Sequence, residues 1–557
     1  RRSPLRDGGK GKEEKGDLQS GSRRGQETRA EQTSLLVLAP PNLLAFHDDN
    51  GDGVSDRSDV LVKGIGFDLK FRGADHTTNG IQVGIDGWIY VAVGDYGFIR
   101  ATGSDGRELA YRGGGIVRCR PDGSELEVVS HGQRNIYDVA ISPELDLFTR
   151  DNTNDGGGWN VRLSHVPHGG QMGYPSLFVN FPDEIIQPLA DYGGGSPCGS
   201  LFIDEPTLPE GLGQSLYTCD WGRSVVYRHP LTKNGAGFTA EQEPFVELPR
   251  PTDMDIDAKG NIYISSWRDG GFNFSKPEVG YVVMVKSPTV IGGNDGSKGT
   301  NRTYESTIEY FLQRLASPSH TVRLYAQRRI LARGASPKVA SGLEQLAASQ
   351  ASVAVRVATI FTLKQLLGEK SHEALAELAK DASIREHALR AIADRTTQLG
   401  NTSPQPFVEA LSDTNPRVRL QAARALGRFG KLPREALVKL LPLTVDRDPL
   451  VAHVAIDSLV QLNAGEVCLA ALISAPEEHR LGAAMVLRHL HDPTVVAGLL
   501  DWLGLPIRPK PGGPTGQAIS DHMTRQLVLA TLCRLHSREG EYTGDWWGTR
   551  PDTSGPY

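Results

Sequence analysis

Hydrophobic and polar positions follow two different periods along the chain, and the change falls near residue 300. Between Leu35 and Ser287, short alternating apolar runs are separated by Gly, Asp, Asn and Pro, the pattern of strands joined by turns. A turn followed by an alternating strand recurs at residues 86–91, 145–148, 214–218 and 259–264. Their aromatic positions are 58, 69 and 46 residues apart, spacings that favour propeller blades with long loops.

From Thr307 onward the apolar period becomes helical, and a short turn, often with Asp and Pro, precedes each second helix. The repeat is marked by a basic residue, with successive steps of 33, 29, 34 and 34 residues between Arg323, Arg356, Arg385, Arg419 and His453. Helix pairs at this spacing bury a continuous core only by stacking. We therefore predict HEAT-like repeats in which each Val packs inward and each Arg meets the neighbouring repeat.

The two periods predict a multidomain β + α chain. The expected parts are a disordered tail (1–33), a β-propeller (34–290), a linker (291–306), an α-helical HEAT-like solenoid (307–505) and a C-terminal loop with one helix (506–557). The tail has almost no apolar side chains with which to offset its ordering entropy. About 250 residues are few for a six-bladed ring, so we expect a six-bladed family member that lacks its N-terminal part.

Composition narrows the class of protein. The chain has 557 residues, 39% of them hydrophobic, and a net charge of -6, which argues against a nucleic-acid partner. The five cysteines are widely spaced, with no CxxC. Buried free thiols are the expectation, and a Cys198–Cys219 disulfide is the alternative. No apolar run of about 18 residues predicts a membrane span.

Residues 48–59 have the oxygen spacing of a calcium-binding loop. Gly53 at the sixth position allows the tight turn, and Asp59 stands at the twelfth, where an EF-hand has a longer Glu. An ordinary Asp/Asn/Gly turn is the alternative. The predicted structural Ca²⁺ ligands are side-chain oxygens of Asp48, Asn50, Asp52, Asp56 and Asp59 and the carbonyl of Val54.

A second group of residues resembles the soluble quinoprotein and aldose sugar dehydrogenases, a family that also includes glucose/sorbosone dehydrogenases. That family has a catalytic His ahead of a "GpDGxlYvxxGD" strand, then a "GxRN" turn. Here His76 precedes residues 84–95 (GIDGWIYVAVGD), and residues 132–135 read GQRN. Residues 114–123 and 169–175 are similar to the family's "GxilRxxpDG" and "GgnYGWP". The sequence departs from the family at Ile136, where a Pro normally follows the turn, and has no clear lysine equivalent after residues 219–221.

The resemblance implies a role for each matching residue. His76 would take a hydroxyl proton while hydride passes to pyrroloquinoline quinone (PQQ), and Asp95 would orient His76 or raise its basicity. Arg134 and Asn135 would bind quinone oxygens, and Arg250 would make a second carboxylate contact. Each residue also has a structural interpretation: His76 bonding a blade loop, Asp95 capping its turn, and Arg134 with Asn135 forming a turn.

The order of the motifs is closer still to planctomycete-type putative membrane-bound dehydrogenase-domain proteins, in which a propeller and HEAT repeats precede a haem-binding CxxCH domain. Residues 195–199, 219–223 and 546–553 match this family in order. The resemblance implies a periplasmic or cell-surface protein that oxidises a carbohydrate or polyol. Electrons would pass to haem c in a cytochrome c domain or protein that this chain does not contain.

Other functions remain open at this point. A non-catalytic propeller could bind carbohydrate or protein, with the HEAT repeats as a scaffold or as the docking surface for a protein partner. A propeller hydrolase would need paired carboxylates or a nucleophile, of which the sequence shows no convincing set. His165 and His168 lie in a Gly-rich stretch that is either a substrate loop or a connection.

Overall fold

The computed structural model describes residues 33–68, 70, 75–153, 160–174, 177, 181–268, 278–286, 307–504, 522–538 and 541–544. The predicted tail, apart from Thr33, and the predicted linker (291–306) lie outside these residues. Contacts divide the chain into a small unit, residues 1–37 with 45–59, and a large unit, residues 38–44 with 60–557. The large unit holds most of the strands and all the helices described below.

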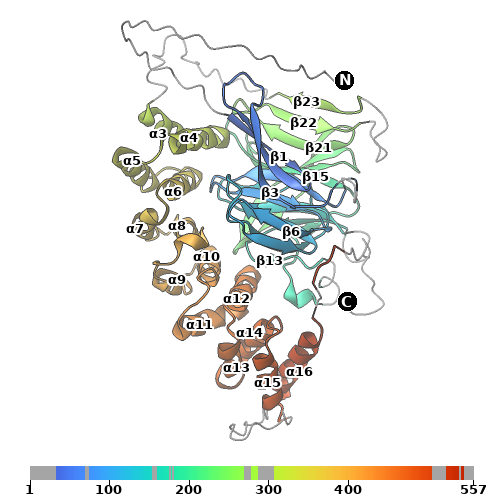
Figure 1. The fold of residues 1–557 in the computed structure, drawn as a ribbon, viewed down its shortest axis with the longest axis vertical. Helices are drawn as coiled ribbons and strands as arrows, with labels where there is room; N and C mark the ends of the chain where they lie inside the picture. Colours follow the sequence, from blue (N-terminus) through green and yellow to red (C-terminus); the bar gives the residue numbers. More distant parts are fainter. Residues whose placement is uncertain are drawn as a thin grey trace, which may run out of the picture. The chain divides into compact units, whose positions relative to one another are not determined.

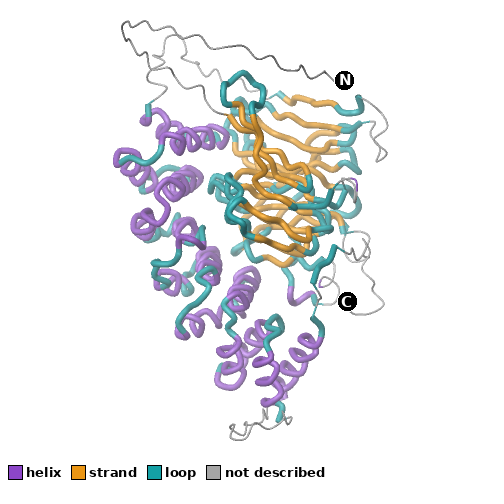
Figure 2. The backbone as a smooth tube through the Cα atoms, viewed as in Figure 1, coloured by secondary structure: helices purple, strands orange, loops and turns teal. Residues whose placement is uncertain are grey.

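The strands form five blade-like sheets, drawn in orange in Figure 2. The predicted propeller is present, and the described residues give it five blades, one fewer than a complete six-bladed ring. A two-stranded hairpin, β18 and β19, accompanies them. The strands are β1 (Thr33–Ala39), β2 (Asn42–Asp48), β3 (Arg57–Lys63), β6 (Phe98–Gly103) and β7 (Glu108–Tyr111) in the first sheet; β4 (Thr78–Val83), β5 (Ile89–Val93), β8 (Gly114–Cys119), β9 (Glu127–Gln133) and β13 (Gly170–Gln171) in the second; β10 (Ala140–Ile141), β11 (Leu147–Asn152), β12 (Val161–His165) and β14 (Ala190–Asp191) in the third; β15 (Pro197–Asp204), β16 (Gln214–Asp220), β17 (Val225–His229) and β20 (Glu243–Glu247) in the fourth; β21 (Pro251–Ile256), β22 (Ile262–Ser266) and β23 (Tyr281–Val285) in the fifth; and β18 (Leu231–Asn234) with β19 (Gly237–Ala240) in the hairpin.

The four recurring segments of the sequence become β5, β11, β16 and β22, each paired on both sides within its sheet. Every residue of β5 is buried, as expected for an interior strand with apolar side chains on both faces. The register places Ile89 opposite Cys119 in β8 and Val91 opposite Ile81 in β4. The local aromatic pattern therefore located one central strand in each of four sheets.

Buried arginines join neighbouring blades. The Arg150 guanidinium in the third sheet lies 3.0 Å from the Asp220 carboxylate in the fourth. Arg162 contacts both oxygens of Asp151 and also donates to the carbonyls of Met172 (2.6 Å) and Gly132 (2.8 Å). Each cation is buried with its counter-charge, which is the condition for tolerating an ion inside a protein.

Helices follow from residue 308 onward, drawn in yellow to red in Figure 1. Side chains at the residue before several helices accept backbone N–H groups, as with Ser352 for Val355 and Asp448 for Leu450, and Pro occupies the first turn after Asp448. The helices are α3 (Ile308–Leu315), α4 (His320–Arg333), α5 (Pro337–Ala347), α6 (Val353–Leu367), α7 (His372–Leu378), α8 (Arg385–Ile392), α9 (Gln405–Ala410), α10 (Pro416–Gly427), α11 (Arg434–Leu440), α12 (Pro449–Gln461), α13 (Gly465–Ser474), α14 (Glu477–Leu487), α15 (Pro493–Trp502) and α16 (His522–His536).

The predicted contact between repeats is present at three successive steps. Arg356 reaches Asp381 at 2.6 Å. Arg385 reaches Asp413 at 2.6 Å, and Arg419 contacts both oxygens of Asp446 at 2.8 Å. We call this series of ion pairs the Arg–Asp ladder. The two outer marked positions bond to the propeller instead: Arg323 pairs with Asp204, and the Gln171 N–H donates to His453 Nε2 at 3.1 Å.

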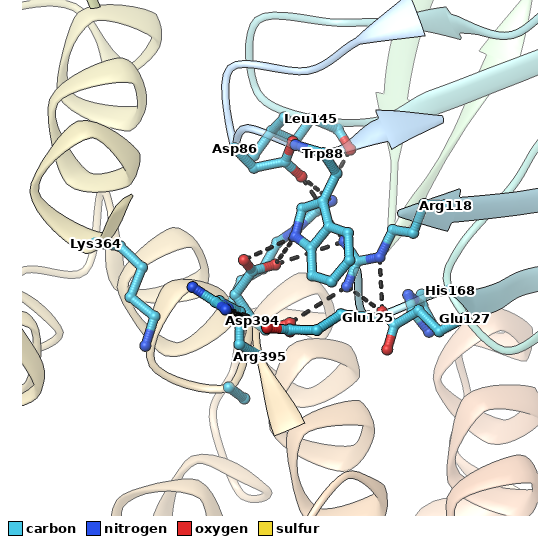
Figure 3. A network of polar contacts seen from close by, with 12 residues as sticks. Asp86, Trp88, Arg118, Glu125, Glu127, Leu145, His168, Lys364, Asp394 and Arg395 are labelled. Carbon is cyan, nitrogen blue, oxygen red and sulfur yellow. Dashed lines mark hydrogen bonds and ion pairs between the residues drawn. The ribbon is translucent and has the colours of Figure 1, made fainter. Parts of the chain in front are cut away.

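A polar network joins the second sheet to helix α8 and its end (Figure 3). The Trp88 indole N–H donates to both Asp394 oxygens, at 2.8 and 3.0 Å. The Arg118 guanidinium lies 3.9 Å from the centre of the Trp88 ring, 3.5 Å from Asp394 and 2.5 Å from Glu127. Trp88 and Arg118 are fully buried, so the contact is a desolvated domain interface.

Two further predictions concern a disulfide between cysteines and helices that could span a membrane. All five cysteines are free thiols, so the Cys198–Cys219 disulfide is not formed. Burial raises the pKa of Cys198 to about 12. Among the described helices, none combines the length and apolar character needed to cross a bilayer.

Candidate functional site

The structure brings His76 and Asp95 together, as predicted. His76 precedes β4, Asp95 follows β5, and His76 Nδ1 lies 2.5 Å from Asp95 Oδ1. Asp95 is fully buried and His76 is 8% exposed. Gly94 makes the approach possible, because a Cβ there would stand 2.5 Å from the backbone carbonyl of His76. The Tyr96 N–H donates to that same carbonyl at 3.1 Å.

Asp75 connects His76 to the GQRN turn. Its Oδ1 accepts the Asn135 amide at 2.6 Å, the Tyr137 hydroxyl at 2.5 Å and the His76 N–H at 3.0 Å. Its Oδ2 lies 3.6 Å from His76 Nε2. Burial and the Asp75 charge raise the pKa of Tyr137 well above its ordinary value, so Tyr137 remains a hydrogen-bond donor. The sequence analysis missed Asp75 and Tyr137; the position of Asp75 beside His76 was the available signal.

The His76 imidazole therefore lies between two carboxylates. An Nδ1–H that donates to Asp95 fixes the tautomer with Nε2 as the basic nitrogen, and Asp75 lies 3.6 Å from that nitrogen. His76 also has φ +63°, a conformation that costs free energy for a non-glycine residue and clusters at functional sites. This arrangement suits a general base.

Arg134 and Asn135 lie in the predicted turn, and the propeller itself uses most of their polar groups. The Arg134 N–H donates to Asp151 Oδ2 at 2.8 Å, and its guanidinium donates to the Asn152 carbonyl at 3.3 Å and to the Asn152 side chain. Asn135 is 6% exposed, and its Oδ1 has no hydrogen-bond partner among the described residues. Arg134 is likewise 6% exposed.

Arg250 stands in a different environment. Its guanidinium lies 4.5 Å from the centre of the Trp221 ring, a cation–π contact. The backbone N–H of Arg250 donates to the Ser224 hydroxyl at 3.3 Å. Its role as a cofactor ligand stays a prediction.

The predicted calcium loop folds around its own backbone. Asp48 accepts the N–H groups of Gly51 (2.6 Å) and Gly53 (2.8 Å), and these bonds lower the pKa of Asp48. Asp59 pairs with Arg57 at 2.7 Å and with His47 at 3.0 Å. The twelfth-position carboxylate is thus held by two basic side chains. The remaining predicted oxygens belong to Asn50, Asp52, Val54 and Asp56, with Asp56 accepting the Asn50 amide at 3.0 Å.

One other group has metal-ligand chemistry. Glu144, Glu386 and His387 offer ligand atoms within 4.8 Å of one another, and the described residues contain no other such set. Two cations already contact it: Lys233 lies 2.6 Å from Glu144, and Arg417 lies 2.9 Å from Glu386. A metal ion would have to displace this charge, so the group is better described as an ion-pair cluster.

A large cleft lies between the second sheet and the helices α10, α12, α14 and α16. Its volume is about 1130 Å³, enough for a small organic ligand or a peptide segment. The lining includes Asp457, whose pKa burial raises to about 6, and His453, whose pKa burial lowers to about 4. Neither His76 nor Arg134 lines it. The sequence analysis did not predict this cleft, because its wall joins residues from both domains.

Residues 29–267 match a family described as Domain of unknown function (DUF7133), and residues 379–460 match HEAT repeats. No curated protein matches the chain. The two matched segments follow one another in the predicted order of propeller and solenoid.

Three solved structures resemble parts of the chain. A PQQ-bound aldose sugar dehydrogenase from Streptomyces coelicolor is 18% identical, with 46% of this chain and 76% of that chain covered and a TM-score of 0.34. An engineered protein is also 18% identical, with coverages of 41% and 68% and a TM-score of 0.23. The karyopherin Kap121p, bound to the extreme C-terminus of the phosphatase Cdc14p, is 15% identical, with coverages of 42% and 30% and a TM-score of 0.28.

Proposed function

We propose that the propeller is a dehydrogenase-type domain in which His76 removes a hydroxyl proton from a carbohydrate or polyol. The observation that supports this most is the 2.5 Å contact between His76 Nδ1 and the fully buried Asp95. A buried carboxylate fixes the imidazole orientation and stabilises the imidazolium that forms on proton transfer. The motif resemblance described above supplies the reaction class, oxidation of an alcohol carbon.

The steps assigned to this chain concern the proton. Substrate hydroxyl binds at His76 Nε2, on the ring nitrogen opposite Asp95. His76 accepts the proton as the C–H bond is broken, and Asp95 compensates the new positive charge. Asp75 restrains the other side of the ring and is itself held by Asn135 and Tyr137. The ring therefore reaches the reacting hydroxyl already oriented, which lowers the entropic part of the barrier.

The described residues fit a quinone cofactor in part. Asn135 Oδ1 is buried without a partner in the described part of the chain and fits a ligand donor, whereas Arg134 and Arg250 already hold Asn152 and Trp221. When bound, pyrroloquinoline quinone supplies the sink for the hydride. Transfer of electrons onward to haem c in a cytochrome partner, and a periplasmic or cell-surface location, rest on the family resemblance and remain predictions.

The test compares the wild-type chain with His76→Asn and Asp95→Asn, and with His536→Asn as a control at an exposed histidine. Asn tolerates positive φ, so His76→Asn removes the imidazole without adding strain. We expect PQQ-dependent dye reduction with a panel of sugars in the wild type, loss of about 10²-fold or more in kcat for His76→Asn, and no change for His536→Asn. For Asp95→Asn we expect kcat to fall, because the imidazole loses the buried carboxylate that orients it.

Binding and turnover are measured separately. PQQ titration by fluorescence quenching reports on the cofactor alone. Saturable binding with turnover that survives in His76→Asn would refute the assigned base. Absence of any PQQ binding to the folded wild-type chain would refute the quinone part of the proposal.

The cleft favours a second candidate, a non-catalytic binding protein. A volume of about 1130 Å³ between propeller and solenoid is large enough to bind a glycan or a peptide segment. A glycan array probed with the wild-type chain and with Asp457→Asn separates the two: binding that depends on Asp457 and not on His76 supports the scaffold interpretation.

We also propose that residues 48–56 bind Ca²⁺, through the oxygens of Asp48, Asn50, Asp52, Val54 and Asp56. These form an oxygen-rich donor set of the type that Ca²⁺ prefers. Isothermal titration with Ca²⁺ should show one site that is lost in Asp48→Ala and kept in Asp59→Asn, because Asp59 is bound by Arg57 and His47. Equal loss in both variants would mean that Asp59 turns toward the ion.

A further inference from the structure

A small cavity lies at the contact between the third sheet and helices α8 and α10. Its volume is about 30 Å³, enough for at least one buried water molecule or a small ion. Arg390, Arg417, Gln421 and Arg424 reach it from the helices, and Asp146 and His165 are among the residues that reach it from the propeller. Charged and polar side chains therefore share the wall with apolar ones such as Leu145 and Leu420.

The wall holds polar atoms that the protein does not satisfy. Arg390 Nε, Arg424 Nε, Gln421 Oε1 and His165 Nδ1 are buried and have no hydrogen-bond partner among the described residues. A buried polar atom without a partner destabilises the folded protein, and four such atoms, two of them arginine N–H donors, belong to residues around one cavity. The two arginine N–H groups need an acceptor, and a 180° rotation of the Gln421 amide turns a third donor toward it.

The charges on the wall do not balance. Asp146 is committed to Arg417 at 2.9 Å, and Arg417 also holds Glu386 at 2.9 Å. Arg390 is 3.8 Å from Asp86. Arg424 is 6% exposed, and the salt bridges between described residues include none to Arg424, whose recorded partner is His168 Nδ1 at 2.7 Å.

His168 cannot supply the missing negative charge. Burial and the Arg424 charge hold the pKa of His168 well below its ordinary value, so the imidazole is neutral and accepts the Arg424 hydrogen bond. Burial and the neighbouring guanidiniums of Arg428 and Arg118 likewise depress the pKa of Arg424. Arginine nevertheless keeps its proton in folded proteins. Glu127 is the carboxylate whose charge acts on Arg424, but it already pairs with Arg118 and Arg428, so the buried Arg424 cation has no carboxylate of its own.

We propose that this cavity binds a chloride ion between the propeller and the solenoid. The Nε–H groups of Arg390 and Arg424 hold the ion, and its charge compensates Arg424. A monatomic anion fits a cavity of about 30 Å³, which exceeds the about 10–15 Å³ that one buried water needs. Because the wall comes from both domains, chloride binds the docked form and stabilises it by linkage.

The test measures unfolding of the full chain in potassium chloride and in potassium gluconate at equal ionic strength. Above the dissociation constant, each tenfold rise in chloride should multiply the folding equilibrium constant about tenfold. Arg424→Met, which keeps a long side chain without charge, should lose this dependence. Arg434→Met is the matched control, because Arg434 on α11 is half exposed and paired with Glu466; it should keep the wild-type dependence.

Crystals of the wild-type chain soaked in bromide give a second readout that needs no variant. An anomalous peak between the side chains of Arg390 and Arg424 supports the site. A chloride dependence that persists in Arg424→Met overturns the proposal, and so does a wild-type cavity without a bromide peak. If the cavity holds a water molecule instead of an anion, stability will not depend on the anion, and this result also overturns the proposal.

Discussion

Removal of the Asp394 carboxylate should uncouple the two domains at the network of Figure 3. Asp394→Ala leaves the buried Trp88 N–H without its two acceptors at 2.8 and 3.0 Å, a hydrogen bond to a charged group worth about 1.5–3 kcal/mol. It also removes one carboxylate from Arg118. Glu127 remains 2.5 Å from Arg118, so this second loss is only part of the about 3–5 kcal/mol measured when a buried ion pair is broken.

A third effect acts in the opposite direction. Burial, and next the charge of Asp394, raise the pKa of Asp86, so removal of Asp394 relieves a repulsion between two buried carboxylates. The hydrogen bond and the Arg118 contact together outweigh this relief, and we expect a net loss of about 3 kcal/mol in the free energy of unfolding.

The assay is urea unfolding of Asp394→Ala, Trp88→Phe and the double variant, followed by tryptophan fluorescence and by helical circular dichroism. The double-mutant cycle should give a coupling energy of about 1.5–3 kcal/mol between Trp88 and Asp394. Asp501→Ala, at an exposed carboxylate, should change stability by less than about 0.5 kcal/mol. A coupling energy below about 0.5 kcal/mol would refute the argument that this bond joins the domains.

Three further predictions concern single residues. Burial raises the pKa of Asp457 to about 6, above its unfolded value of about 3.9. The neutral carboxyl therefore favours the folded state by about 3 kcal/mol below pH 4, and this stabilisation is lost as pH rises through 6. Asp457→Asn should flatten the pH dependence of urea midpoints between pH 4 and 7. Arg356→Ala removes bonds to Asp381 and to two other groups and should cost about 2–4 kcal/mol, measured by thermal unfolding; a change under about 0.5 kcal/mol would contradict the ladder. Gly94→Ala places a Cβ 2.5 Å from the His76 carbonyl and should lower kcat with little change in KM, read from steady-state dye reduction, whereas wild-type kcat would show that the turn can move.

The repeat contacts could be predicted from the sequence because each one joins neighbouring units. Arg356 and Asp381 are 25 residues apart, and Arg419 and Asp446 are 27 apart. A contact that recurs at the repeat length leaves a periodic trace in the residue types. The central strand β5 was visible for a similar reason, since its apolar run and the turn before it are contiguous.

The domain interface leaves no such trace. Trp88 and Asp394 are 306 residues apart, and nothing near either residue indicates the other. The candidate site falls between these cases: the His76–Asp95 pair could be predicted from a motif, whereas the commitment of Arg250 to Trp221 depends on three-dimensional neighbours. In the calcium loop, the spacing placed Asp59 at the twelfth position. The spacing does not show that Arg57, two residues earlier, binds the Asp59 carboxylate and competes with a metal ion for it.

The marked residues on either side of the Arg–Asp ladder contact the propeller, Arg323 through Asp204 and His453 through Gln171. Repeat arrays usually tolerate gain or loss of a unit, because each unit touches only its neighbours. Here the propeller contacts the array at both of these positions and so fixes the distance between them. Deleting one repeat between residues 356 and 419 would bring one end out of step with its anchor, so the number of repeats in this protein is constrained to match the spacing of the blades.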